Sequence, residues 1–179
     1  MRAAAALLER TGAQEAVTLR AVAREAGVSA PAVYGHFADL AALLDAVVDE
    51  GFDRLRAEIL AAVTPVDDPV ERLVTGCRTY VEAGLAAPAR YRAMFGGHRG
   101  HGEAAFAVLV DGVTACVAAG RSDSTDPAAD AALLWTALHG VVTLRTAGGT
   151  SSRTDLDALV RTLTGRLALV REVSGGDRA

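Results

Sequence analysis

Apolar residues recur every three or four positions along almost the whole chain, and this spacing constrains the fold more than any other feature. A period of three to four is that of one face of an α-helix, whereas a half-buried strand alternates apolar and polar residues. No alternating run in the sequence is long enough to build a sheet. Ala, Leu, Arg and Glu, which are abundant here, also favour helix. The sequence therefore predicts an all-α protein.

Clusters of turn-forming residues divide this pattern into about nine helices. We expect the breaks at Gly12, Gly27, 64-TPVDDP-69, 96-GGHRGHG-102, 120-GRSDSTDP-127 and 148-GGTSSR-153. Two of the later helices start at capping residues: Asp126 precedes Pro127, and Thr154 with Asp157 resembles a capping box. A chain of 179 residues can bury a sizeable core without disulfides or a metal ion.

The first fifty residues differ from the rest because their predicted helices are short. These helices are expected to end at about Thr11, to run from Thr18 to Ala26 and from Ser29 to about Gly35, and to precede a long helix that begins at Asp39. Between the second and third, Gly27 can adopt a left-handed turn, Val28 can fill the small core and Ser29 can cap the next helix. This is the construction of a helix-turn-helix motif.

In such a motif the second helix enters the major groove of DNA, with its N-terminal end against the base edges. The residues at that end are Ser29, Ala30, Pro31, Ala32 and Val33. Tyr34 and His36 carry polar tips that can reach phosphates, although both can also be ordinary surface residues, while Val33 and Phe37 can pack inward. Thr18 can cap the second helix and present its hydroxyl to a phosphate. Because Ala30, Pro31 and Ala32 form few hydrogen bonds, we expect readout through methyl contacts, backbone and DNA shape.

The stretch 18-TLRAVAREAGVSAPAVYGHFADLAALLDAV-47 resembles the DNA-binding domain of the tetracycline-repressor-like (TetR) transcriptional regulators. Their pattern runs through Ala-Gly-Val-Ser, three variable residues, an apolar residue, Tyr, and His or Tyr before Phe. Farther along, 134-LWTALHG-140 and 91-YRAMFGG-97 are similar to the C-terminal domain of a TetR subgroup named for its Trp, His and Gly. The resemblance implies a three-helix DNA-binding domain over residues 1–47 and a helical effector-binding and dimerisation bundle over residues 48–179.

This resemblance also implies a function: a dimeric, sequence-specific regulator, expected to be a repressor that a small, mainly apolar molecule releases from a near-palindromic operator. Two features depart from the family pattern. Leu40 stands where members usually carry a basic residue that reaches a phosphate, so one backbone contact is expected to be missing. The first helix also begins at Met1 without the usual extra turn or basic arm, so either the true start lies upstream or this protein lacks that arm.

The helices from about residue 68 onward are apolar over wide faces, as in a bundle whose interior can open into a pocket. The candidate effector-contacting residues are Tyr80, Tyr91, Met94, Phe95, Trp135 and His139. Taken one at a time, each is better explained as a core residue, and Cys77 belongs to the same faces. The family resemblance is what favours a pocket. Trp135 and His139 are four residues apart and share one helix face, so His139 either orients Trp135 or contacts the effector.

The last two predicted helices, 127–147 and 155–173, are expected to form a homodimer interface. One apolar stripe runs through Leu156, Leu159, Val160, Leu163, Leu167 and Val170. Ala131, Ala137 and Gly140 are small enough to allow another helix to approach closely. The TetR resemblance implies a four-helix interface about a twofold axis, and the alternative is an intramolecular core.

Charge and composition exclude several other classes. The formal net charge of -4 argues against a protein coated with nucleic acid, although residues 1–38 hold four Arg against three Glu. Cys77 and Cys116 are far apart in sequence and are expected to be free thiols in a reducing cytoplasm, with a redox switch as the alternative. No apolar run reaches the ~18 residues of a membrane span, and the N-terminus MRAAAALLERTG carries charge too early for the apolar core of a secretion signal. We therefore expect a cytoplasmic protein that does not associate with a membrane.

We also expect no cofactor, no metal site and no enzymatic activity. In the loop 96–102, His98 and His101 lack a nearby third ligand, and Arg99 lacks the context of a phosphate loop, so the loop is expected to be a linker. No set of nucleophile, base and orienting residue stands at a recognisable spacing. The remaining alternative function is that of a helical structural or adaptor dimer, which leaves 26-AGVS-29 and Tyr34 unexplained.

Overall fold

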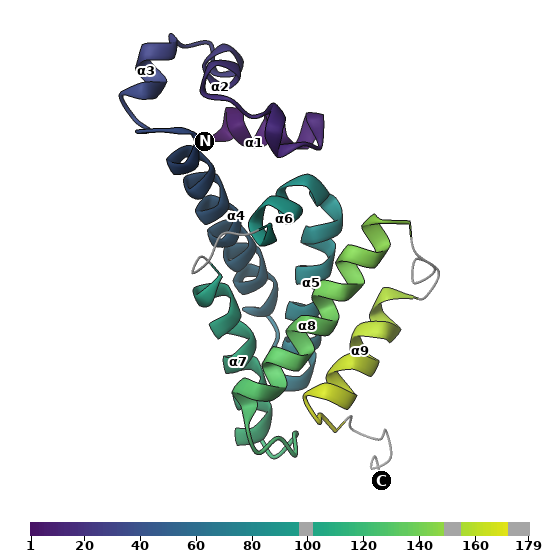
Figure 1. Ribbon diagram of the computed structural model, residues 1–179. Coiled ribbons are helices and arrows are strands. Elements are labelled where there is room, and N and C mark those ends of the chain that lie inside the picture. Colours follow the sequence, from purple (N-terminus) through teal and green to yellow (C-terminus); the bar gives the residue numbers. More distant parts are fainter. Residues whose placement is uncertain (97–101, 149–154, 172–179) are drawn as a thin grey trace. The chain divides into compact units, whose positions relative to one another are not determined.

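The computed structural model describes residues 1–96, 102–148 and 155–171. These residues form nine α-helices and no strand, which confirms the all-α prediction (Figure 1). The helices are α1 (Arg2–Thr11), α2 (Leu19–Ala26), α3 (Ala30–Tyr34), α4 (Leu40–Val63), α5 (Pro69–Ala86), α6 (Pro88–Phe95), α7 (Glu103–Ala118), α8 (Pro127–Thr146) and α9 (Leu156–Leu167). A single 3-10 turn at Gln14–Ala16 joins α1 to α2.

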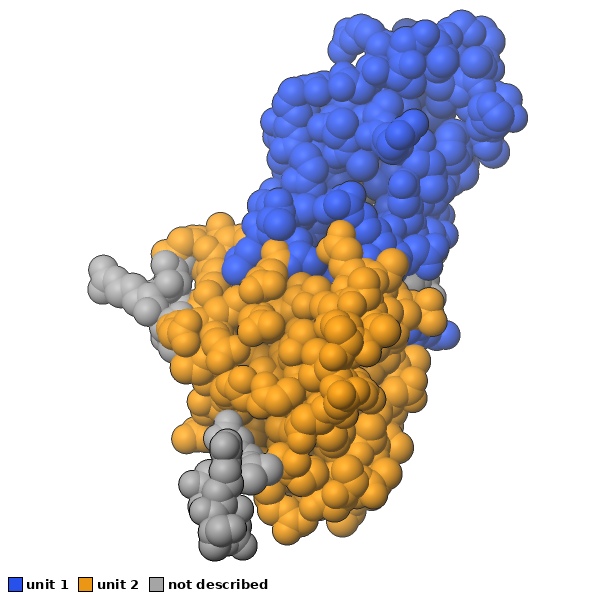
Figure 2. Space-filling model, turned by 180° about the vertical axis from the view of Figure 1, so that it is seen from behind, with its two compact units in different colours: residues 1–55, 83–104 blue, residues 56–82, 105–179 orange. Residues whose placement is uncertain are grey.

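The chain folds into two compact units (Figure 2). Unit 1 consists of residues 1–55 and 83–104, and unit 2 consists of residues 56–82 and 105–179. The long helices α4 and α5 each contribute residues to both units.

The core of unit 1 forms where the apolar faces of α1, α2, α3, α4 and α6 meet. Its fully or nearly buried members are Ala4, Leu7, Leu8, Val17, Leu19, Val22, Ala23, Val33, Leu43, Val47, Ala89 and Ala93. In α2 the buried residues Leu19, Val22 and Ala23 follow the i, i+3, i+4 spacing that lines one helix face. This core holds the three short helices on the start of α4.

Two contacts join α1 to α6 within unit 1. The first turn of α6 begins with Pro88, and its N-cap Ala87 has no side chain that can accept a hydrogen bond. Glu9 of α1 supplies the missing acceptor, because its Oε1 accepts from the backbone N–H of Arg90 at 2.9 Å. Arg92 returns the contact by donating from Nη2 to the carbonyl of Gly12 at 3.3 Å. The break at Ala87 that separates α5 from α6 was not among those expected, although a residue before proline disfavours helix.

α4 and α6 also pack closely. A Cβ placed on Gly51 of α4 would lie 2.9 Å from Sδ of Met94, so the absence of a side chain permits this approach. Phe52 then meets Phe95 edge to face, with ring centroids 5.3 Å apart, and Tyr91 lies 4.7 Å from Phe95. These aromatic contacts fix α6 against the middle of α4.

Unit 2 is a helical bundle, and two of its helices, α5 and α8, start at the same signal. Asp68 precedes Pro69 and accepts from the N–H of Glu71 at 3.0 Å, and Asp126 precedes Pro127 and accepts from the N–H of Ala129 at 3.1 Å. The second of these caps was predicted and is confirmed. Buried residues of the bundle include Val74, Cys77, Val81, Val113, Cys116, Leu134, Leu138, Val142 and Val160.

α9 departs from the sequence prediction at both ends. Its N-cap is Asp155, which accepts from the N–H of Ala158 at 3.1 Å, while Thr154 lies outside the described residues. The helix stops at Leu167 instead of continuing to 173, since Leu169 takes a positive φ of 49° and Val170 pairs with Ser122.

A contact distant in sequence causes this early end. Ser122 Oγ donates to the carbonyl of Ala168 at 2.6 Å, and the N–H of Asp123 donates to the carbonyl of Leu169 at 3.1 Å. These bonds satisfy backbone groups that a continuing helix would use. The spacing had predicted that Val170 belongs to the apolar stripe of α9. That prediction is wrong, because the helix ends before this residue.

By length and composition, one described helix, α8, could cross a membrane, although sequence analysis did not single it out. The mean hydropathy of its best 18-residue window is 1.2, and 28% of that window is buried. Core helices of soluble proteins can be equally long and apolar. The buried face of α8 belongs to the core of unit 2.

Candidate nucleic-acid interface

The interface begins at α2, whose two ends are fixed by local hydrogen bonds. Thr18 is the N-cap, and its hydroxyl accepts from the N–H of Ala21 at 3.1 Å. At the other end Gly27 is left-handed with φ 68°, and the N–H of Val28 bonds to the carbonyl of Ala23 at 3.0 Å. The predicted turn is thus confirmed. The expectation that Val28 fills the core is wrong, because its side chain is 49% exposed and only its backbone closes the helix.

α3 is a helix of five residues anchored by one side chain. Ser29 is its N-cap, with Oγ 3.4 Å from the N–H of Ala32, and Pro31 occupies the first turn. Val33 is buried in the core of unit 1, and Phe37 packs partly against the same core, as predicted. With Val33 facing inward, the opposite side of α3 faces solvent.

That solvent-facing side carries most of the residues predicted to contact DNA. We define the reading surface as the exposed residues Ser29, Pro31, Ala32, Tyr34 and His36. Tyr34 is 54% exposed, which suits a side chain whose hydroxyl reaches a phosphate. Ala30 differs from its neighbours, since it is half-buried and packs against the core. Thr18 is also exposed.

Charged groups around the reading surface fall into two sets. Arg10 of α1 forms a bidentate ion pair with Glu25 of α2, with N–O distances of 2.8 and 3.0 Å. This ion pair holds the pKa of Glu25 below its usual value. Arg20 and Arg24 lie exposed on α2, and sequence analysis counted them only as charge. Their exposure makes them additional candidates for phosphate contacts.

Leu40 illustrates the departure from the family pattern. It is half-buried at the first position of α4 and packs against the core of unit 1. The Leu40 side chain thus packs on the core. It cannot make the phosphate contact expected of a basic residue at this position.

The predicted effector residues divide equally between the two units. Tyr91, Met94 and Phe95 belong to unit 1, where Tyr91 and Met94 are buried and contribute to its packing. Tyr80, Trp135 and His139 belong to unit 2.

Within unit 2 an aromatic group surrounds Trp135. Its ring centroid lies 6.2 Å from Phe106 and 6.1 Å from His139. Burial lowers the pKa of His139, which favours the neutral imidazole. A neutral, half-buried imidazole beside an indole can exchange hydrogen bonds with an uncharged molecule. Phe106 had not been singled out from the sequence.

Neither a metal site nor a reactive thiol appears among the described residues. No three or more His, Cys, Asp or Glu side chains there are grouped so that they could hold a metal ion, and His98, Arg99 and His101 lie outside the described ranges. Cys77 and Cys116 are buried and not joined by a disulfide. Burial raises the pKa of Cys77 to about 12 and that of Cys116 to about 11. Since the thiolate is the reactive form, these values disfavour the redox switch.

Two sequence models of one protein family match the chain. The model described as bacterial regulatory proteins of the tetR family matches residues 1–47, and the one described as a tetracyclin repressor-like C-terminal domain matches residues 73–167. The chain belongs to the TetR family. This TetR-family chain is therefore a transcriptional regulator whose N-terminal helix-turn-helix binds DNA. The family, rather than its Trp-His-Gly subgroup, is what these matches establish.

Solved structures share the fold along nearly the whole length of this TetR-family chain. A protein of unknown function from Rhodococcus sp. RHA1 is 30% identical, with a TM-score of 0.81 over 94% of this chain and 92% of that one. The fatty acid degradation regulator FadR from Bacillus halodurans is 17% identical, with a TM-score of 0.74 over 99% and 97%. The TetR-family regulator PfmR from Thermus thermophilus is also 17% identical, with a TM-score of 0.68 over 95% and 97%. No curated protein matches the chain.

Proposed function

We propose that this TetR-family regulator is a cytoplasmic repressor that binds a near-palindromic operator and leaves it when a small molecule binds. The observation that carries the proposal is the exposed face of α3, where Ser29, Pro31 and Ala32 stand beside Tyr34 while Val33 anchors the helix from behind. A regulator of this kind requires no cofactor and no catalytic residues.

We assign DNA binding to residues 1–47 and effector binding with dimerisation to residues 48–179. The two family matches, over 1–47 and 73–167, support this division. The compact units do not coincide with these two domains. Helix α6 falls in the second domain by residue number, but it packs on α1 and belongs to unit 1. The bonds of Glu9 and Arg92 give α6 a direct hold on the first helix of the DNA-binding domain.

The proposed dimer uses the last two helices. On α8 the residues Leu133, Ala137, Gly140 and Leu144 share one face, and Leu133 and Leu144 are 57% and 56% exposed. A Cβ on Gly140 would meet no atom within 4 Å, so a second helix has room to approach there. An exposed apolar stripe of this kind is typical of a surface that another subunit covers.

The proposed effector is uncharged and mainly apolar, and it contacts the aromatic group of unit 2. Trp135, Phe106 and neutral His139 provide an apolar surface with one hydrogen-bonding group, and Tyr80 belongs to the same unit. We also propose that the chain belongs to the Trp-His-Gly subgroup, because 134-LWTALHG-140 and 91-YRAMFGG-97 resemble its C-terminal domain.

The decisive experiment is an electrophoretic mobility shift on DNA upstream of the protein's own reading frame. We expect a sequence-specific shift that is lost in Ala32→Glu, since a carboxylate on the reading surface repels phosphates and occupies the groove. Ala57→Glu adds the same charge at an exposed position of α4 and serves as the control. A structural or adaptor dimer without DNA binding would give no specific shift in any of the three proteins.

A further inference from the structure

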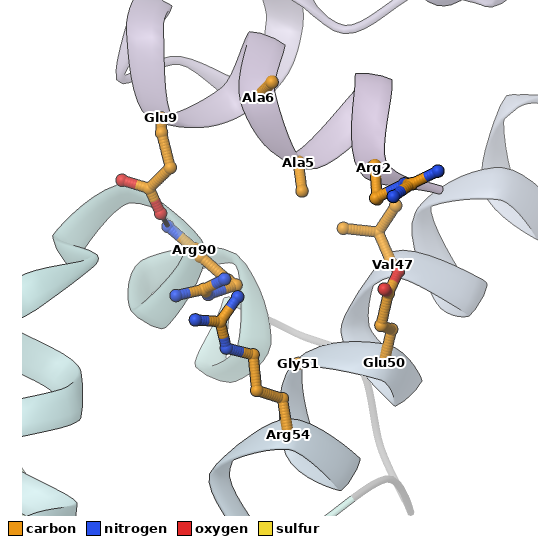
Figure 3. Close-up of a pocket in the computed structure, with 9 residues that line it drawn as sticks. All are labelled: Arg2, Ala5, Ala6, Glu9, Val47, Glu50, Gly51, Arg54 and Arg90. Carbon is orange, nitrogen blue, oxygen red and sulfur yellow. Dashed lines mark hydrogen bonds between the residues drawn. The ribbon is translucent and has the colours of Figure 1, made fainter. Parts of the chain in front are cut away.

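A cavity of about 260 Å³ opens in unit 1 between α1, α4 and α6 (Figure 3). At roughly 30 Å³ for each water molecule, it can hold about nine waters or one small organic molecule. None of the residues predicted to contact DNA or the effector lines it. The cavity is therefore a feature that the proposed function does not use.

Its lining combines a small apolar wall with charged side chains from three helices. The apolar part of the lining is Ala5 and Ala6 of α1 with Val47 and Gly51 of α4. The charged residues that line the cavity are Arg2, Glu9, Glu50, Arg54 and Arg90. Three guanidinium groups against two carboxylates leave this lining with a net positive charge.

Two of the guanidinium groups define where a ligand would bind. Figure 3 shows the side chains of Arg54, from α4, and Arg90, from α6, extending toward the same end of the cavity. Like charges brought together in this way are stabilised by an anion, and the planar fork of arginine matches carboxylate and phosphate oxygens. One carboxylate lies at the first turn of α6, because Glu9 Oε1 accepts from the backbone N–H of Arg90.

We propose that this cavity is a binding site for a small multivalent oxyanion, a dicarboxylate or a phosphate monoester, held by Arg54 and Arg90. The carboxylate of Glu9 also lines the cavity, so its negative charge repels a bound oxyanion. Because Glu9 joins α1 to α6 through the backbone N–H of Arg90, this repulsion weakens a hydrogen bond between the two helices. The site is separate from the proposed effector site, and the regulator function does not depend on it.

The test is calorimetric titration of the full chain without DNA, using inorganic phosphate and succinate as probes at an ionic strength kept constant with chloride. We expect saturable binding of at least one probe, with one site per protomer and a dissociation constant near or below about 1 mM. Succinate alone would assign the site to dicarboxylates, and phosphate alone to phosphate esters. Absence of saturable binding of either probe up to about 10 mM would overturn the proposal.

Matched variants locate the site. Arg54→Gln and Arg90→Gln should each weaken binding at least about fivefold, whereas Arg56→Gln removes the same charge from an exposed position of α4 outside the cavity and should leave it unchanged. Glu9→Gln should tighten binding, because it removes the repelling charge while keeping an acceptor for the N–H of Arg90. In an NMR titration that N–H signal should move with ligand in the wild type. Equal affinity in Arg90→Gln and the wild type would place the anion elsewhere and overturn the assignment.

Discussion

The hydroxyl of Thr18 caps α2, and because the residue is exposed we expect the same group to contact a phosphate. We predict that Thr18→Ala weakens binding to operator and to random DNA by similar factors, since phosphate contacts position the protein without reading sequence. The same change should cost about 1 kcal/mol of folding free energy through the lost cap. Fluorescence anisotropy with both DNAs and urea unfolding measure the two effects separately.

Two further variants separate these roles of Thr18. Thr18→Ser keeps an oxygen that can accept from the N–H of Ala21, so both stability and DNA binding should be largely retained. Tyr34→Ala should weaken binding to operator and to random DNA, as Thr18→Ala does. It should leave the free energy of unfolding nearly unchanged, because Tyr34 is 54% exposed. A loss confined to the operator would mean that these side chains read bases.

At the scale of elements, Arg161 is the main polar link between α9 and α5 in unit 2. Its Nη1 and Nη2 donate to Glu71 at 2.7 and 2.8 Å, and its Nε donates to Asp157 at 2.9 Å. Asp157 also accepts from Arg78 at 3.2 Å. Hydrogen bonds from Arg161 are the main reason that the pKa of each of these two carboxyls lies below its usual value.

We predict that Arg161→Gln lowers the free energy of unfolding by about 1 kcal/mol near pH 7, since the network is partly exposed to solvent. Because the carboxyl pKa values are lower in the folded state, this contribution is present above the unfolded values of about 4 and disappears as the pH falls through the folded ones. Arg166→Gln, an exposed position of the same helix, is the control. Urea unfolding between pH 7 and pH 3 should show the two variants converging toward acid, and a difference that grows there would contradict the assignment.

The elements that sequence analysis placed well are those whose ends depend on neighbouring residues. The limits of α2 follow from Thr18 and Gly27, and the start of α8 from Asp126 and Pro127, all of which act over a few residues. The end of α9 was wrong because Ser122, 46 residues before Ala168, decides it. Likewise, the cap that Glu9 gives α6 joins positions 81 residues apart. Periodicity and turn chemistry describe local preference, so contacts of this range leave no pattern that a single sequence reveals.

The candidate site shows the same limit in its side chains. The inward direction of Val33 was predictable from its spacing to Phe37, and it correctly left Tyr34 and His36 outside. The exposure of Val28 was not predictable, because its backbone bond to Ala23 fixes the turn whichever way the side chain points. Sequence analysis also grouped six effector candidates that the fold divides between two units.

At the scale of the whole molecule, the exposed stripe on α8 predicts a homodimer in solution. Leu144→Arg should convert the dimer to a monomer, because it places a charge where two apolar helices would meet. Light scattering at micromolar concentration reports the mass, and Ala57→Arg, which adds the same charge on exposed α4, should remain dimeric. A wild-type monomer, or a Leu144→Arg protein that stays dimeric, would place the interface elsewhere.

In the proposed dimer, release of DNA by an effector would follow thermodynamic linkage. Two reading surfaces must meet successive major grooves about 34 Å apart, so a ligand that stabilises another arrangement lowers DNA affinity. DNA must then lower ligand affinity by the same factor, typically about 5- to 150-fold. Trp135 is the single tryptophan and contacts Phe106 and His139, so its emission should report effector binding directly.

We predict that a screen of uncharged apolar compounds finds one that shifts Trp135 emission and releases operator DNA over the same concentration range. Adding operator should raise the ligand concentration at half-maximal fluorescence change. The factor should equal the one by which the ligand lowers DNA affinity, because a single coupling free energy sets both ratios. His139→Gln should lower the affinity for the ligand if the imidazole forms a hydrogen bond to it. Arg90→Gln should leave that affinity unchanged if the oxyanion cavity is not the effector site. An effector that releases DNA yet binds Trp135→Phe and His139→Gln with unchanged affinity would leave the regulator intact and move its effector site away from this aromatic group.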